Sequence, residues 1–251
     1  NQLRSFVINA LAEDTGDGDH SSLASIPDTA SGRARLIVKE SGIISGLRVA
    51  REVFSIADPS LQAEILLRDG DRVQYGDIAL TVSGKAQSIL RSERLVLNIM
   101  QRMSGIATAT ALYTEKVSDT QAKITDTRKT TPGMRALEKE AVRTGGGVNH
   151  RMGLYDMIML KDNHIDYAGG ITAAIRRTQE YLSAHGLNLR IEVEARNIRE
   201  VTEILATGGV DRIMLDNFSI PETRKAVALI AGRTETESSG GITLENVRDY
   251  A

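Results

Sequence analysis

The sequence predicts an α/β protein in which a small α+β sheet domain precedes a partial (β/α) barrel domain. Two observations carry this prediction. Before about residue 100, short alternating apolar segments are separated by turn signals, as in a small sheet. After about residue 122, strand-like apolar runs alternate with helical stretches, which indicates parallel strands joined by crossover helices. We therefore expect a first domain over residues 1–104 and an α/β barrel domain over residues 105–251.

The first domain should contain a small sheet followed by a long helix. We expect strands over 33–40, 61–69 and 77–84, because apolar and polar residues alternate there between turn signals. Apolar residues then recur at spacings near 3.6, which predicts a helix over about 87–117.

The second domain should repeat strand and helix. The expected strands cover 122–127, 155–160, 189–195, 210–215 and 233–239. The expected helices lie near 134–143, 170–184, 197–207 and 220–231, with a further helix beginning near Thr243. A full barrel has eight such units, so we expect the remaining strand and tail to lie outside this sequence.

Composition excludes several classes of protein. Lys plus Arg number 31 against 33 for Asp plus Glu, a net charge of -2, so no global electrostatic attraction to nucleic acid or anionic membrane is expected. The sequence has no Cys, which excludes disulfides and thiolate chemistry and fits a cytoplasmic protein. No apolar run approaches the roughly 18 residues that span a bilayer.

A cationic stretch stands out in this acidic chain. Residues 128–161 carry seven cations and three anions. Arg128, Arg151 and Lys161 flank predicted strands, so their side chains can point into a shared cavity. Guanidinium pairs with carboxylate through a planar fork, and ammonium supplies a compact charge. A polyanionic small ligand would relieve the repulsion among them. The alternative is a set of ordinary surface ion pairs.

Three further cations of this stretch, Arg135, Lys139 and Arg143, lie on a predicted helix. For these we favour ordinary surface ion pairs, because Glu138 and Glu140 are close enough to pair with them locally.

Glycines 145–147 do not match the dinucleotide-binding spacing. A structural loop that leaves room for His150 and Arg151 and a phosphate cradle both remain open. His150 could contact a ligand, although a lone loop histidine is more often incidental. His164, at a predicted strand end, could equally be structural.

Two acids of one predicted strand should share a face. Glu192 and Glu194 alternate with apolar residues, so both carboxylates point to the same side of the strand. Buried carboxylates need a cation or hydrogen-bond donors, which Lys161 or a Mg²⁺-carrying substrate would supply. Asp216, at the end of the next strand, could join them. The alternative is an internal network of Glu with Lys or Arg.

Strand carboxyl ends in a parallel α/β sheet converge on one rim, where βα loops form the site. Ser239 ends the last predicted strand, and Gly240-Gly241 lies between it and a predicted helix. Glycines permit close backbone approach and N–H groups at a helix start bind phosphate, although a plain strand–helix turn would look similar.

Several motifs together carry a family resemblance. They are LAEDTGDGD (11–19), SERLVLN (92–98), TRKTTPG (127–133), GGGVNHR (145–151), GLYDMIMLKDNH (153–164), IEVEA (191–195), IMLDNF (213–218) and ESSGGI (237–242). In this order and spacing the chain resembles quinolinate phosphoribosyltransferase over nearly its whole length. It departs from that family at GDHSS and at Glu140, neither of which is a proposed ligand contact.

The resemblance implies an activity. The enzyme would transfer a phosphoribosyl group from phosphoribosyl pyrophosphate (PRPP) to quinolinate with decarboxylation, giving nicotinate mononucleotide, pyrophosphate and CO₂ in NAD biosynthesis. It implies Mg²⁺ carried by PRPP, and a cytoplasmic homodimer with shared active sites in which Arg94 of each subunit serves its neighbour.

The resemblance also implies site residues. Arg128, His150 and Arg151 would hold the two carboxylates of quinolinate. Thr127, Lys129 and Lys161 would complete that lining. Glu194 and Asp216 would bind the ribose hydroxyls and Mg²⁺. Ser239, Gly240 and Gly241 would hold the 5′-phosphate. The catalytic set implied is Lys129, Lys161, Glu194 and Asp216.

Three other functions compete with this one. A related phosphoribosyltransferase-like enzyme would use a different acceptor. An aldolase would form a Schiff base on Lys161. A non-catalytic anion-binding module would need the basic cluster but not Glu194 and Asp216.

Overall fold

A computed structural model describes residues 2–251 of the chain. The chain forms two compact units. The first contains the residues up to Glu115 together with Lys123–His150, and the second contains Lys116–Ala122 and Arg151–Ala251. Among the residues described, no helix is both long and apolar enough to cross a membrane.

An antiparallel sheet organises the first unit. Its strands are β1 (Ser31–Ile37), β3 (Gln62–Ile65) and β5 (Ile78–Lys85), in the order β1-β5-β3. A second, two-stranded pair joins β2 (Gly42–Ile43) to β4 (Arg72–Val73). The three strands predicted for this region are therefore confirmed; β3 is shorter than predicted, and β1 and β5 are shifted along the chain.

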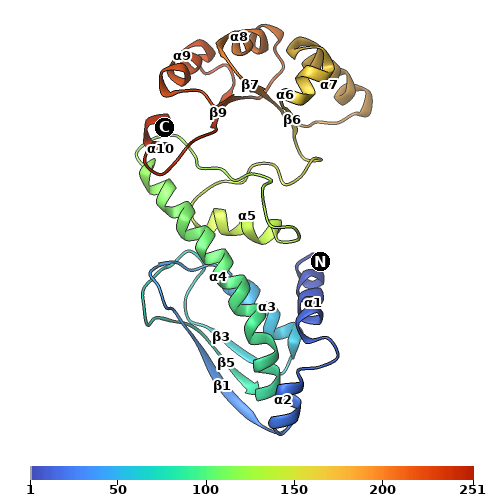
Figure 1. The fold of residues 1–251 in the computed structure, drawn as a ribbon, viewed down its shortest axis with the longest axis vertical. Helices are drawn as coiled ribbons and strands as arrows, with labels where there is room; N and C mark the ends of the chain where they lie inside the picture. The colour runs from blue at the N-terminus through green and yellow to red at the C-terminus, as the bar shows by residue number, and fades with distance from the viewer. Residues whose placement is uncertain (1) are drawn as a thin grey trace. The chain divides into compact units, whose positions relative to one another are not determined.

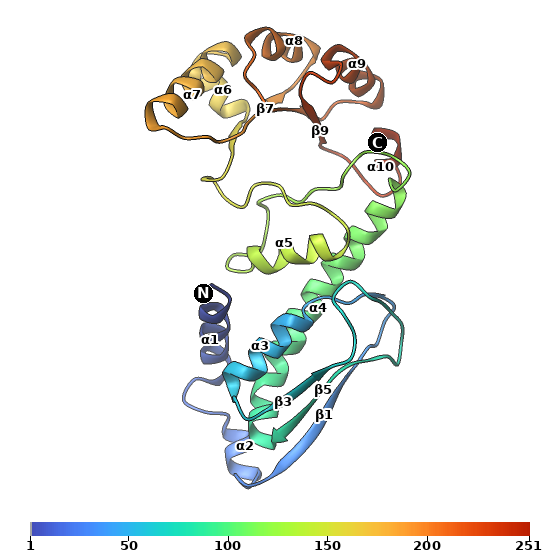
Figure 2. The same ribbon diagram turned by 180° about the vertical axis from the view of Figure 1, so that it is seen from behind.

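Helices cover one face of the three-stranded sheet, as Figure 2 shows for α3 and α4. The helices of this unit are α1 (Gln2–Thr15), α2 (His20–Ser25), α3 (Leu47–Ala57), α4 (Ala86–Lys116) and α5 (Arg135–Thr144). The predicted long helix is α4, and its buried residues follow the helical period that predicted it. Its side chains share one apolar core with α1, α3 and the inner face of the sheet.

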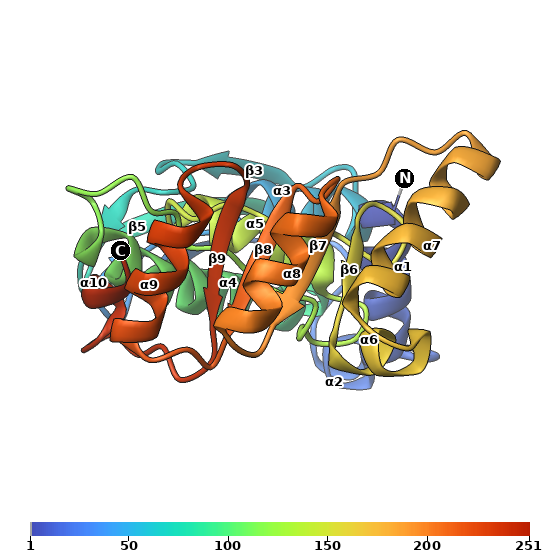
Figure 3. The ribbon, with the colours of Figure 1, turned by 90° about the horizontal axis from the view of Figure 1, so that it is seen from above.

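The second unit is a parallel sheet with helices on one face (Figures 1 and 3). The strands lie side by side in chain order as β6 (Ile158–Leu160), β7 (Ile191–Ala195), β8 (Arg212–Asp216) and β9 (Glu235–Ser239). The helices are α6 (Asp162–Ala168), α7 (Ile171–His185), α8 (Ile198–Thr207), α9 (Ile220–Ile230) and α10 (Val247–Tyr250).

Alternation along these strands separates an apolar face from a polar one. Ile191 and Val193 of β7, with Ile213 and Leu215 of β8, are buried in the core that the helices cover. Side chains of the intervening residues point to the opposite face, because successive strand residues alternate in direction. The acids of β7 therefore lie on the face away from this core.

The strand predicted over 122–127 is wrong. Only a single parallel bridge, Thr125 to Val148, forms there. The Asp126 carboxylate instead accepts a hydrogen bond from the His150 backbone N–H at 2.9 Å. Backbone hydrogen bonds to Val148 form this one bridge, and the side chain of Asp126 adds further hydrogen bonds, so the segment is fixed without a full strand.

The strand predicted over 155–160 begins only at Ile158. The carboxylate of Asp156 accepts hydrogen bonds from the backbone N–H groups of Met152 and Gly153 at 2.6 and 2.8 Å. These bonds form a tight turn, so the residues before Ile158 cannot take extended strand geometry.

The helix predicted from Thr243 begins only at Val247. Thr243 N–H donates to Asn246 Oδ1 at 2.7 Å, and Asn246 Nδ2 donates to the Gly241 carbonyl at 3.0 Å. A hydrogen-bonded turn therefore separates the β9 loop from α10.

Candidate active site

The predicted site residues divide between the two compact units. Those in the first unit are Arg94, Thr127, Arg128, Lys129 and His150. Those in the second are Arg151, Lys161, Glu194, Asp216, Ser239, Gly240 and Gly241.

In the second unit, the parallel register brings predicted site residues to one face. Glu194 lies opposite Met214, and Asp216 lies opposite Ser239. Paired residues of neighbouring strands point to the same side of a sheet, and so do residues two apart on one strand. Glu194, Asp216 and Ser239 therefore share the polar face, near the carboxyl ends of β7, β8 and β9.

Of the two partners left open for the buried acids, Lys161 contacts Glu194. Lys161 Nζ lies 3.1 Å from Glu194 Oε2. The Glu194 side chain is 8% exposed, whereas that of Lys161 is 46% exposed. A buried carboxylate thus has its cation, and the cation still faces solvent, where it can meet a ligand.

Glu192 takes part in a different network, at the amino ends of the strands. Arg212 Nη1 lies 3.5 Å from Glu192 Oε2 and 3.0 Å from Glu237 Oε2. Arg212 also bonds Glu235 at 2.8 Å. Burial alone would lower the pKa of Arg212, but the hydrogen bond to Glu235 and the charges of Glu192 and Glu237 raise it above its usual value. For Glu192 the structure thus supports the internal Glu–Arg alternative.

The loop after β9 depends on glycine. Gly240 has φ +91°, and Gly241 has φ +64°, a region that other residues rarely adopt. Because α10 is short and begins only at Val247, the expected helix start does not follow this loop directly. A phosphate bound here would depend on the loop's own N–H groups.

In the first unit, the prediction of a surface ion pair for Lys139 is wrong. Lys139 is 0% exposed and pairs with Asp126. Its Nζ also donates to the His150 carbonyl at 3.0 Å. Asn149 Nδ2 bonds Asp126 and the Lys139 carbonyl, the latter at 2.8 Å, and Arg143 bonds Asn149. The buried ion pair therefore holds the backbone on which His150 sits.

The acids of α5 also pair differently from the prediction. Glu138 accepts a hydrogen bond from Arg102 of α4 at 2.9 Å, and Glu140 pairs with Arg48 of α3 at 2.7 Å. Burial raises the pKa of Glu138, but hydrogen bonds from Thr131 and Arg102 outweigh burial and lower it overall. These pairs tie α5 to α3 and α4 and not to neighbours on the same helix.

Segment 127–130 presents its cations from a turn. Thr127 Oγ1 accepts from Lys129 N–H at 2.9 Å, and the Arg128 carbonyl accepts from Arg135 at 3.4 Å. The Nε of Arg128 is buried and has no hydrogen-bond partner among the residues that the structure describes. A buried guanidinium donor without a partner is costly unless an acceptor, such as a ligand carboxylate, binds it.

The two remaining predicted arginines differ in setting. Arg151 is half-buried, and its Nη1 donates to the Met157 carbonyl at 3.2 Å, which anchors the guanidinium beside the start of β6. Arg94 lies on the exposed side of α4.

Two ambiguous motifs have structural roles. His164 Nδ1 accepts a hydrogen bond from the Lys161 backbone N–H at 3.0 Å, so this histidine caps α6. At Gly145, a Cβ atom would lie 2.3 Å from the Ala107 carbonyl oxygen of α4. Glycine is therefore needed at this position so that the loop can approach α4.

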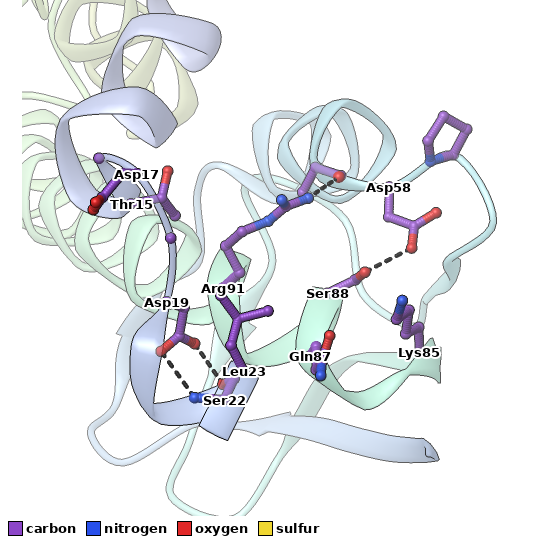
Figure 4. Close-up of a pocket in the computed structure, with 14 residues that line it drawn as sticks. Thr15, Asp17, Asp19, Ser22, Leu23, Asp58, Lys85, Gln87, Ser88 and Arg91 are labelled. Carbon is purple, nitrogen blue, oxygen red and sulfur yellow. Dashed lines mark hydrogen bonds between the residues drawn. The ribbon is translucent and has the colours of Figure 1, made fainter. Parts of the chain in front are cut away.

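A cavity of about 520 Å³ lies elsewhere in the first unit (Figure 4). Its carboxylates are already engaged: Asp19 accepts from Ser22, and Asp58 accepts from Ser88 Oγ at 2.6 Å and Ser60 Oγ at 2.7 Å. The hydrogen bond from Ser88, followed by those from Ser60, lowers the pKa of Asp58 to about 2. The cavity includes none of the predicted site residues, so its size does not identify the active site.

Family models match both parts of the chain. The model described as "Quinolinate phosphoribosyl transferase, N-terminal domain" matches residues 19–104. The model described as "Quinolinate phosphoribosyl transferase, C-terminal domain" matches residues 106–251.

Individual relatives of the chain carry names of the same family as the matching models. The chain is 45% identical to quinolinate phosphoribosyltransferase [decarboxylating] 1 of Nicotiana glauca, over 98% of this chain and 74% of the relative. It is 46% identical to the chloroplastic nicotinate-nucleotide pyrophosphorylase [carboxylating] of Arabidopsis thaliana, with the same coverage of 98% and 74%. The crystal structure of NadC from Streptococcus pyogenes superposes with a TM-score of 0.93 at 40% identity, covering 99% of this chain and 87% of that one.

Proposed function

The chain belongs to the quinolinate phosphoribosyltransferase family, and from this premise we propose how its residues carry out the reaction. The enzyme is a decarboxylating pentosyltransferase that forms nicotinate mononucleotide in NAD biosynthesis. One observation carries the assignment of roles: Lys161, Glu194, Asp216 and Ser239 gather on one polar face of the sheet in a chain that matches both family domains. We also place the functional division of the chain at residues 104 and 105, between the two family matches.

PRPP binds along the carboxyl ends of β7, β8 and β9 in this proposal. Glu194 and Asp216 accept hydrogen bonds from the ribose hydroxyls. The loop Ser239-Gly240-Gly241 holds the 5′-phosphate, where glycine lets the backbone approach an anion closely. The position of these residues on one face of the sheet supports this arrangement, because Asp216 of β8 lies directly opposite Ser239 of β9.

Mg²⁺ fits the same carboxylates. Glu194 and Asp216 offer hard oxygen donors, and Mg²⁺ usually binds through one or two carboxylates plus substrate phosphates. When bound with PRPP, the ion offsets negative charge on the pyrophosphate leaving group.

Quinolinate binds through cations in this proposal. Arg128, His150 and Arg151 hold its two carboxylates, while Thr127, Lys129 and Lys161 complete the lining. The buried, unpartnered Nε of Arg128 supports a bound anion, and so does the Arg151 guanidinium, whose position is fixed by the Met157 carbonyl.

The reaction then needs no protein nucleophile. Pyrophosphate leaves C1 of the ribose with the electrons of the C–O bond, and the pyridine nitrogen lone pair captures the oxocarbenium-like centre. The quaternised ring loses its 2-carboxylate as CO₂, because N⁺ stabilises the electron pair left on C2, which then takes up a proton. The protein positions two anions and offsets their charge. A Schiff base would need a free neutral amine, whereas Lys161 donates to Glu194.

Asp216→Asn should abolish most turnover while quinolinate still binds. Removing one charge that acts in the transition state costs about 10²- to 10³-fold in kcat. The assay incubates protein with quinolinate, PRPP and Mg²⁺ and measures nicotinate mononucleotide and CO₂, expected in equal amounts from the wild type. Exposed Asp249→Asn is the matched control. A non-catalytic anion-binding module would release neither product, and full turnover by Asp216→Asn would refute the role of that carboxylate.

Mixing two inactive variants should restore activity if Arg94 serves the neighbouring subunit of a homodimer. In a heterodimer of Arg94→Ala and Lys161→Ala subunits, the Arg94→Ala subunit keeps an intact Lys161 and receives Arg94 from its neighbour. One of two sites is then complete. The exposed position of Arg94 on α4 supports this proposal. The variants are denatured, mixed and refolded, with refolded single variants as controls. Sedimentation should give a dimer, and no gain in activity on mixing would contradict shared sites.

We propose the cytoplasm as the compartment, with small-molecule substrates and no nucleic acid or membrane as partner. The names of the Arabidopsis relative and of several Nicotiana relatives assign those proteins to chloroplast or mitochondrion. Cell fractionation with an antibody to this chain tests the proposal, and an organellar signal would refute it.

A further inference from the structure

Asn217, directly after β8, has a backbone conformation that few residues adopt. Its φ is +54°, in the left-handed region. Among residues 2–251, Ala231 at φ +51° is the only other non-glycine residue with positive φ. Such a conformation costs free energy in an L-residue, although Asn tolerates it better than most, and it tends to occur at functional sites.

The two left-handed residues have different surroundings. Ala231 is exposed and ends α9 as its C-cap, where its N–H donates to the Val227 carbonyl at 2.9 Å. A left-handed residue is a common way to end a helix, so the conformation of Ala231 needs no further explanation. Asn217 ends a strand, so helix capping does not account for it.

The conformation of Asn217 allows three interactions at once. Its backbone N–H donates to the Ser239 carbonyl at 2.8 Å, which extends the pairing of β8 with β9 by one residue. Its side-chain Nδ2 donates to Asp216 Oδ2 at 2.8 Å. Its Oδ1 lies against Gly240, where a Cβ atom would come within 2.1 Å. Figure 3 shows β8 and β9 as neighbours in the sheet.

Asn217 therefore connects two parts of the site that PRPP would occupy at the same time. On one side is the carboxylate assigned to the ribose, and on the other is the loop assigned to the 5′-phosphate. The amide is neutral, so it restricts rotation of the Asp216 carboxylate without neutralising its charge. The opposing contact with Gly240 leaves the amide little room to turn away.

We propose that Asn217 is a positioning residue for the phosphoribosyl donor: its amide orients the Asp216 carboxylate toward the ribose and sets the spacing between that carboxylate and the Ser239-Gly240-Gly241 loop. This inference rests on the function proposed above. It predicts a defect specific to PRPP, because the quinolinate-binding cations are other residues.

The test compares Asn217→Gly with Ala231→Gly. Both changes replace a left-handed residue by glycine, which adopts that conformation without strain, so we expect an unchanged or higher Tm for both variants. Only Asn217→Gly should lose activity. Loss of one hydrogen bond to a charged group predicts a fall in kcat/KM for PRPP of about 10- to 100-fold, while the KM for quinolinate stays within about twofold. Ala231→Gly should match the wild type in both constants.

A second variant distinguishes the effect of the Asn217 amide, a hydrogen-bond donor, from the effect of its left-handed backbone conformation. Asn217→Asp keeps tolerance of the left-handed conformation but replaces the amide donor with a carboxylate beside Asp216. It should lose at least as much kcat/KM for PRPP as Asn217→Gly does. Wild-type kinetics in Asn217→Gly would overturn the inference, as would a lower Tm with equal loss toward both substrates. If the wild-type protein forms no nicotinate mononucleotide, the proposed function fails instead, so the two failures are distinguishable.

Discussion

Lys139→Met should lower the free energy of unfolding by about 3–5 kcal/mol, the range for removing one partner of a buried ion pair. The lysine is fully buried, and its Nζ contacts both Asp126 and the His150 carbonyl. Methionine nearly preserves the volume, so the loss comes from the charge left on Asp126 and not from a cavity. The measurement is the urea midpoint combined with the slope of the unfolding transition.

Lys123→Met is the matched control, because Lys123 is exposed and its loss should change stability by less than about 0.5 kcal/mol. Adding Asp126→Asn to Lys139→Met should cost less than the sum of the single changes, since the two groups interact directly. A loss below about 1 kcal/mol for Lys139→Met would contradict the energetic importance of this pair. Because Lys139 also holds the backbone of His150, the KM for quinolinate should rise in any Lys139→Met protein that folds.

Arg151→Ala should reduce kcat/KM for quinolinate by about 30- to 150-fold, which corresponds to about 2–3 kcal/mol for a lost charge-assisted contact. The Met157 carbonyl fixes the guanidinium, so the side chain is oriented before the ligand arrives. Alanine removes the charge together with this orientation. Initial rates at saturating PRPP and varied quinolinate measure the effect.

Arg199→Ala is the control for Arg151→Ala. Arg199 is exposed on α8, so this substitution should leave kcat and the KM for quinolinate unchanged. Arg151→Lys keeps the charge but cannot form a planar fork, so its kcat/KM should lie between those of the wild type and Arg151→Ala. An Arg151→Ala enzyme with wild-type kcat/KM would remove this residue from the quinolinate site.

The second unit was the more predictable part of the chain. Its apolar runs and intervening helical stretches specify a parallel sheet, and alternation within one strand places Glu192 and Glu194 on a common face. Lys161, one of the two partners considered for these buried acids, contacts Glu194. Alternation alone could not show that the two acids have different cationic partners. Arg212 contacts Glu192 only because β7 and β8 pair in the sheet.

The buried network in the first unit could not be foreseen. A helical pattern tells which residues share a face, but it does not tell what covers that face. Lys139 is buried because segment 123–127 and the loop at His150 both fold over α5, and those contacts depend on side chains distant in sequence. The Asp126 side chain adds hydrogen bonds to the His150 backbone and to Lys139 beside the single backbone bridge to Val148.

Helices α1 and α3 were missed for another reason. The buried residues of α1, Val7 and Leu11, form a stripe too narrow to stand out in a short polar sequence. In α3 the signal was present, since Leu47, Ala50 and Val53 recur every three residues and are all buried. Helical periodicity in the segment between two predicted strands therefore indicates α3.

The pairing of Arg212 with acids at the amino ends of the strands has an evolutionary consequence. Arg212 and its acids lie at the amino ends of the strands, whereas Glu194, which we propose contacts the phosphoribosyl donor, lies near the carboxyl end of β7 and pairs with Lys161. Residues at one end of the strands can therefore change without altering the ion pairs at the other end. A descendant lineage can exchange residues at the carboxyl ends of the strands and inherit the Arg212 cluster intact, so new substrate preferences can arise without rebuilding the scaffold.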